Sequence, residues 1–228
     1  MYGYTTVSSV SQVDWDKFAT LGPDYMRANG TEMPNGYWWV PAHSNNYKSA
    51  NRGVNDIDMI VIHASEGYTA GVRTFQEPDR KASAHYGVQW NGDIAQMVDD
   101  KDIGWHAGGY IGTNDRSIGI EHAGFSNLGP EMWQSPQLKA SAKLVASLAR
   151  KYDVPLDREH IIGHYQIPNQ THFDPGDYWP WDRYMRWVKW YYVRPYVLGV
   201  GALAILGTGT VLLWGRKERK RIESWERV

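Results

Sequence analysis

The sequence contains no cysteine and carries a net charge of only −1 at pH 7. Without cysteine there are neither disulfides nor thiolate ligands, so any metal site must be built from histidine and carboxylate side chains. Without an excess of basic residues there is no overall field of the kind that attracts nucleic acids. We therefore expect no nucleic-acid partner.

The sequence also shows no signal-peptide pattern and no internal repeat. Residues 1–15 have neither a basic start nor an apolar run, so no secretory signal peptide is expected. A chain of 228 residues with 42% hydrophobic content predicts one well-buried domain with appendages. Residues 1–55 are polar and rich in asparagine and glycine, which predicts an irregular N-terminal arm. The domain itself is predicted over residues 56–190.

Three short apolar runs each end at a polar side chain. They are residues 59–62 before His63, residues 118–120 before Glu121, and residues 161–163 before His164. Such runs are typical of buried strands that present a side chain at their C-terminal ends. The two histidines are therefore expected to converge on one edge of a sheet.

Two further signals complete the predicted domain. Asn91-Gly92-Asp93 predicts a hairpin turn, because asparagine and glycine both tolerate positive φ. Ser135 can cap a helix that has Pro136 at its first position, and apolar residues follow at helical spacing as far as Tyr152. The predicted fold class is α/β, with a mixed central β-sheet flanked by helices.

Residues 196–214 contain no charged side chain. As a helix this segment would be about 28 Å long, close to the hydrocarbon thickness of a bilayer. Trp and Tyr residues crowd its N-terminal end, Trp214 closes the other end, and five basic residues follow within 216–221. We expect a transmembrane helix over residues 191–215, with 196–214 in the lipid bilayer, and a basic tail over 216–228. A buried core helix is the alternative, and the membrane orientation stays open.

His63, His164 and Asp174 offer two imidazoles and a carboxylate, with room for water in a fourth position. This is the ligand set of a catalytic zinc site. The first two ligands lie about a hundred residues apart in the sequence, and no short metal motif such as HExxH is present. From spacing alone, ordinary surface or core histidines remain an alternative.

Six short stretches, in this order, carry a family resemblance. They are Ile60-Val61-Ile62-His63, Ser83-Ala84-His85-Tyr86, Asp102-Ile103-Gly104-Trp105-His106-Ala107-Gly108, Ser117-Ile118-Gly119-Ile120-Glu121, Ile161-Ile162-Gly163-His164 and His172-Phe173-Asp174-Pro175-Gly176. The chain resembles the type 2 N-acetylmuramoyl-L-alanine amidases, a family of zinc enzymes that share their fold with peptidoglycan recognition proteins and many phage endolysins. The resemblance covers roughly residues 35–190.

The resemblance implies a role for each site residue. His63, His164 and Asp174 would bind Zn²⁺, and Glu121 would be the general base toward the water that the metal activates. His172 stands where many members have a lysine that stabilises the oxyanion, and an imidazole can do the same task. As a minority alternative, His172 replaces Asp174 as the third ligand.

Two other positions bear on the site. Ala84 stands where some phage members have a tyrosine, which leaves the base role to Glu121 alone. His85, Trp105 and His106 are expected to contact substrate. For Trp105 and His106 the alternative is a packed tryptophan with a hydrogen-bonded histidine.

The implied function is hydrolysis of the amide bond between N-acetylmuramic acid and L-alanine in peptidoglycan. We expect a single-pass membrane protein, in a host or virion membrane, whose domain acts on the cell wall. The apparent lack of a signal peptide favours a phage endolysin over a bacterial wall-remodelling amidase. The alternatives are a non-catalytic peptidoglycan-binding module and a membrane protein whose domain is structural. Stem-peptide type and oligomeric state stay open.

Overall fold

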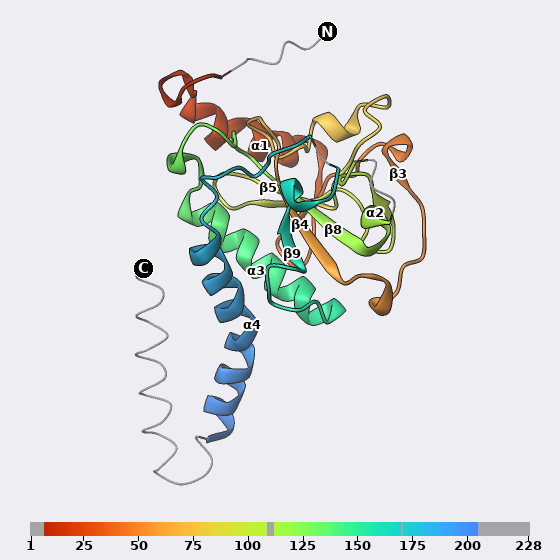
Figure 1. Cartoon of the computed structure of the whole chain (residues 1–228), viewed down its shortest axis with the longest axis vertical. Helices are drawn as coiled ribbons and strands as arrows, with labels where there is room; N and C mark the ends of the chain where they lie inside the picture. Colours follow the sequence, from red (N-terminus) through yellow and green to blue (C-terminus); the bar gives the residue numbers. More distant parts are fainter. Residues whose placement is uncertain (1–6, 109–111, 170, 205–228) are drawn as a thin grey trace.

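The computed structural model describes residues 7–108, 112–169 and 171–204 (Figure 1). A seven-stranded sheet has the order β1-β2-β6-β5-β8-β4-β9, and β3 pairs with β7 separately. The strands are β1 (Thr31–Glu32), β2 (Trp38–Trp39), β3 (Tyr47–Lys48), β4 (Met59–Ala64), β5 (Tyr86–Val88), β6 (Ile94–Gln96), β7 (Ile103–Gly104), β8 (Ser117–His122) and β9 (Ile161–Gly163). The α-helices of the described residues are α1 (Trp15–Asn29), α2 (Thr113–Arg116), α3 (Ser135–Tyr152) and α4 (Trp181–Ala204).

The sheet is mixed, as predicted. Strands β5, β8, β4 and β9 run parallel to one another, whereas β5 and β6 form the antiparallel hairpin. In the turn, the N–H of Gly92 donates to the carbonyl of Gln89, and Gly92 alone takes a positive φ, of 95°. Asn91 instead bonds Asp93 through its side chain. The predicted hairpin is confirmed, with glycine as the residue that requires left-handed backbone.

The two faces of β4 and β8 have different surroundings, because side chains alternate along a strand. Ile60 and Ile62 pack with Ile118 and Ile120 in the main core, to which α3 contributes Leu138, Ala142, Val145 and Leu148. On the opposite face, Val61 belongs to a small separate cluster with Ala107 and Ile162. This opposite face is the one that carries His63.

The predicted amphipathic helix is α3. It begins at Ser135 itself, preceded by Gln134 at the N-cap, with Pro136 in its first turn. It ends at Tyr152, after which Asp153 takes a left-handed conformation. Helix α4 packs along α3 and then continues beyond it (Figure 1).

The prediction of an irregular arm over residues 1–55 is wrong for much of its length. Helix α1 begins after Asp14, whose side chain accepts from the N–H of Lys17, and β1 and β2 extend the main sheet beyond β6. Phe18 and Met26 of α1 are fully buried. Part of this segment therefore contributes to the core.

No helix within residues 7–108, 112–169 and 171–204 is long and apolar enough to cross a membrane. Helix α4 carries charged side chains along the part that precedes residue 196, namely Asp182, Arg183, Arg186, Lys189 and Arg194. The predicted transmembrane helix is therefore not supported here. Residues 196–204 continue α4, and residues 205–214 and the predicted basic tail lie outside the described residues.

Candidate active site

The site lies where three adjacent parallel strands end. His63 is the second-last residue of β4, Glu121 is the second-last residue of β8, and the two are register partners. Register partners on parallel strands present their side chains to the same face of a sheet. His164 follows β9 directly and opens a 3-10 turn, η6 (His164–Gln166). The strand pairing therefore brings together residues that are far apart in sequence.

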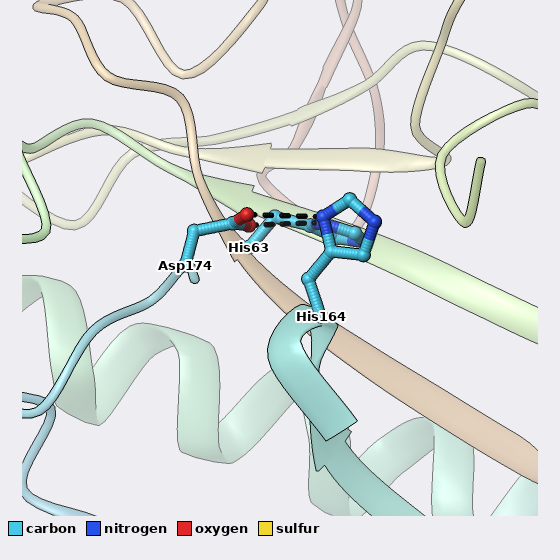
Figure 2. A group of neighbouring side chains, drawn as sticks. All are labelled: His63, His164 and Asp174. Carbon is cyan, nitrogen blue, oxygen red and sulfur yellow. Dashed lines mark hydrogen bonds and ion pairs between the residues drawn. The ribbon is translucent and has the colours of Figure 1, made fainter. Parts of the chain in front are cut away.

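Asp174 joins the two histidines from the loop that follows η6 (Figure 2). Its Oδ2 lies 3.2 Å from His63 Nδ1, and its Oδ1 lies 3.0 Å from His164 Nδ1. The N–H of Ala64 also donates to Oδ2 over 3.3 Å. Three potential ligand atoms, one from each residue, lie within 4.8 Å of one another, and all three residues are buried. The structure thus brings together the three residues predicted as metal ligands.

The electrostatics favour a neutral histidine beside an ionised carboxylate. Burial lowers the pKa of His63 to about 4, although Asp174 acts in the opposite direction. Burial alone would raise the pKa of Asp174, but the hydrogen bonds with His164 and His63 outweigh it and the net shift is downward. Neutral imidazole and carboxylate are the forms that bind metal.

Glu121 is the second carboxylate of the site. Its Oε2 is buried and has no hydrogen-bond partner among the described residues. Burial, together with the negative charges of Asp174 and Glu66, raises the pKa of Glu121 well above its usual value. A carboxyl group with a raised pKa and a free oxygen can accept a proton near neutral pH.

Comparison with known proteins agrees with this geometry. The profile of the N-acetylmuramoyl-L-alanine amidase family, Amidase_2, matches residues 53–177. The chain belongs to this family. The resemblance drawn from the six sequence stretches is thereby confirmed.

Curated and structural relatives of this amidase cover different shares of the chain. N-acetylmuramoyl-L-alanine amidase A of Achromobacter lyticus is 33% identical over 166 residues, which are 64% of this chain and 89% of the relative. The 1,6-anhydro-N-acetylmuramyl-L-alanine amidase AmpD of Haemophilus influenzae is 35% identical over 114 residues, or 48% of this chain and 60% of the relative. A crystal structure of a Se-Met AmpD derivative superposes with a TM-score of 0.53 at 24% identity, covering 65% of this chain and 92% of that one. That structural likeness shows the shared fold.

His172 lies at the solvent side of the amidase site. Its ring stacks on the ring of His164 at 4.6 Å between centroids, and its side chain is 62% exposed. Its Nδ1 lies 3.9 Å from Asp174 Oδ1, farther than either buried histidine. The structure thus places Asp174, rather than His172, between His63 and His164.

His85 and His106, two expected substrate contacts, are both buried. His85 is fully buried, where it accepts from the N–H of Gly119 and approaches the guanidinium of Arg52 at 2.8 Å. Burial and the charge of Arg52 lower the pKa of His85 to about 4. The ring of His106 is buried behind His63, with 3.1 Å between His106 Nδ1 and His63 Nε2. Both rings are buried, and the expected substrate contacts stay predictions.

Trp105 is half-buried, and its main chain pairs with Ser83. Its substrate contact stays a prediction.

Sequence reasoning missed a third carboxylate, Glu66. Its φ is 48°, and its carboxylate accepts hydrogen bonds from the backbone N–H and the hydroxyl of Ser126. Burial raises its pKa, and its charge acts on Glu121. The available signal was a carboxylate three residues after His63, the second-last residue of β4.

Proposed function

We propose that this amidase hydrolyses the amide bond between N-acetylmuramic acid and the L-alanine of the stem peptide, using Zn²⁺ held by His63, His164 and Asp174. Membership of the amidase family supports the reaction. The observation that carries the mechanism is the buried His63–His164–Asp174 cluster on the same sheet face as Glu121.

The spacing of the donor atoms suits zinc. Zinc lies about 2.0–2.2 Å from nitrogen and oxygen ligands, so two ligands of a tetrahedral ion are roughly 3.3 Å apart. The separations are close to this value, at 3.2 Å from His63 Nδ1 to Asp174 Oδ2 and 3.0 Å from His164 Nδ1 to Asp174 Oδ1. One ligand atom from each of the three residues lies within 4.8 Å of the others. His164 Nε2 is also buried without a hydrogen-bond partner among the described residues. A set of two histidines and one carboxylate leaves a coordination position open, as in catalytic rather than structural sites.

A zinc ion at this site would supply Lewis acidity, acidifying a water molecule and polarising the amide carbonyl. Glu121 performs the proton transfers. Its carboxylate takes a proton from water as the carbon–oxygen bond forms, and returns it to the departing amine nitrogen as the carbon–nitrogen bond breaks. His172, exposed at the rim, donates an N–H to the negative charge that develops on the carbonyl oxygen.

The test combines metal analysis with one substitution. The purified protein should contain one zinc per chain and release stem peptide from muramoyl peptides, and a chelator should abolish turnover. Glu121→Gln should slow turnover roughly a hundredfold or more while zinc stays bound. Glu32→Gln, at an exposed position in β1, is the matched control and should leave the rate unchanged. Zinc binding without turnover in the wild type would instead indicate a peptidoglycan-binding module.

We also propose that residues 196–214 anchor the chain in a membrane, as in a membrane-attached lytic enzyme such as an endolysin. The support is the uncharged sequence with its flanking aromatic and basic residues. The full chain should sediment with membranes and resist extraction by salt and carbonate. A chain ending near residue 190 should not sediment. Full-length protein in the soluble fraction without detergent would refute the anchor.

A further inference from the structure

His106 follows β7 and lies flat against the backbone of β8. The absence of a side chain at Gly119 makes this possible, because a Cβ there would lie 2.4 Å from Cγ of His106. The loop is held from the other side by Asn114, whose Oδ1 accepts from the N–H groups of His106 and Ala107 at 3.1 Å and 2.8 Å. The ring is therefore fixed in position and orientation.

A line of hydrogen bonds runs from His63 through His106 to the start of β8. His63 Nε2 lies 3.1 Å from His106 Nδ1, and His106 Nε2 lies 3.3 Å from Ser117 Oγ. Ser117 Oγ in turn donates to the carbonyl of Thr113 at 2.5 Å. Each imidazole in the line uses both of its nitrogens, since His63 Nδ1 faces Asp174.

The last acceptor fixes the direction of the whole line. A carbonyl oxygen can only accept, so Ser117 donates its single hydroxyl hydrogen to the carbonyl of Thr113. Ser117 Oγ must then accept from His106 Nε2–H. No carboxylate bonds the His106 ring among the described residues, and a buried imidazole without one stays neutral. Its Nδ1 is then an acceptor, and His63 must be the donor, through Nε2–H.

We propose that His106 is a positioning residue that sets the tautomer of His63. With its hydrogen on Nε2, His63 leaves the lone pair of Nδ1 for a metal ion held between it, Asp174 and His164, in place of a hydrogen given to Asp174 Oδ2. Partners of this kind orient metal-binding histidines in other proteins. The inference rests on the proposed zinc site, and it gives His106 a part that requires no contact with substrate.

Zinc affinity of the full chain, measured by competition with a chelator, tests the proposal. His106→Phe keeps a ring but removes the acceptor, and should weaken zinc binding by about 10- to 100-fold. His106→Asn places an amide oxygen near the position of Nδ1 and should recover most of that loss. His160→Phe is the matched control, because His160 precedes the N-terminal end of β9 whereas the site lies at its C-terminal end. This variant should bind zinc as the wild type does. Melting of the metal-free proteins establishes that each variant is folded.

A second measurement reads the tautomer directly. In zinc-loaded wild type, ¹⁵N spectra of the histidine rings should show His63 with its hydrogen on Nε2, with its signals assigned by their loss in His63→Gln. Protonation at Nδ1 would overturn the proposal, even if His106→Phe could not be obtained folded. Unchanged zinc affinity in folded His106→Phe would overturn it while leaving the proposed function intact. A wild type that binds no zinc would refute the proposed function, and the role of His106 with it.

Discussion

Pro195 removes a hydrogen-bond donor from the middle of α4, and a residue of α3 compensates for it. In a regular helix the carbonyl of Tyr191 accepts from the N–H of residue 195, which proline lacks. Arg150 of α3 reaches across and donates through Nη1 to the carbonyls of Tyr191 and Tyr192, at 3.0 Å and 3.1 Å. Its guanidinium also lies 5.7 Å from the centre of the Tyr192 ring.

Removing the Arg150 guanidinium should therefore destabilise the packing of α4 on α3. A hydrogen bond from a charged group contributes about 1.5–3 kcal/mol, and the lower end applies because Arg150 is only half-buried. Arg150→Met keeps most of the aliphatic contact and should lower the free energy of unfolding by about 1.5 kcal/mol. For a chain of this size that corresponds to a melting temperature lower by about 3–6 °C.

A double-mutant cycle isolates the compensation. In Pro195→Ala the alanine N–H can bond Tyr191, so Arg150→Met should cost clearly less in that background, with a coupling of about 1 kcal/mol. Thermal unfolding of the four proteins gives the coupling, and Lys143→Met, at an exposed position in the same helix, is the control. The reasoning would be refuted if Arg150→Met left the free energy of unfolding unchanged, or lowered it equally in the wild type and in Pro195→Ala.

Two further predictions concern the site and the buried histidines. Asp174→Ala should lose zinc in metal analysis, whereas His172→Ala should keep zinc and lose about a hundredfold in turnover; the reverse result would make His172 the ligand. Burial lowers the pKa of His85 to about 4 and that of His122 to about 3, so between pH 6.5 and 4 the unfolded chain binds protons that the folded chain does not. The metal-free protein should thus lose stability as pH falls from 6.5, by about 1.4 kcal/mol per pH unit for each histidine. Melting that is unchanged between pH 6.5 and 5 would contradict this.

The strands that position the site were predictable from the sequence, because an apolar run that ends at a polar residue marks both the strand and the candidate site residue. An apolar run ending at His63, Glu121 or His164 indicates both a buried strand and a polar group at its end. The parallel pairing of β4 with β8 and β9 then placed these side chains together. Asp174 was a candidate ligand by residue type, and the family resemblance made it a specific prediction, since nothing in its loop sequence indicates that it reaches His63.

Helix α1 was missed because its sequence contains signals that normally mark a loop. Gly22 and Pro23 stand inside the helix. A Cβ at Gly22 would lie 1.9 Å from Oε1 of Gln89, so the missing side chain makes room for the end of the Gln89 side chain after β5 and does not mark a turn. Tertiary packing explains this glycine, and local propensity does not.

His85 and His106 show why residue type alone did not decide between substrate contact and burial. Both stand in motifs of the family, and both are compatible with either role in sequence. The deciding residues are the glycines opposite them, because Gly104 leaves space for the ring of His85 and Gly119 for that of His106. Gly119 follows Ser117 by two residues, so both face the same side of β8 and together form a surface for one imidazole.

Side chains alternate along β4 and β8, so one face of these strands carries the core residues and the other face carries the site residues. Ile60, Ile62 and their partners on β8 face α3 and form the core, so their truncation should act on folding. On the other face, Ser117 and Gly119 fix His106, His106 contacts His63, and Glu121 stands next to His63 in register. A strand pair packed on one side by branched aliphatic residues is rigid. That rigidity allows the opposite side to hold, beside a buried histidine, a carboxyl group whose buried oxygen has no partner in the described part of the chain. A flexible loop could relax this arrangement by exposing either group to water.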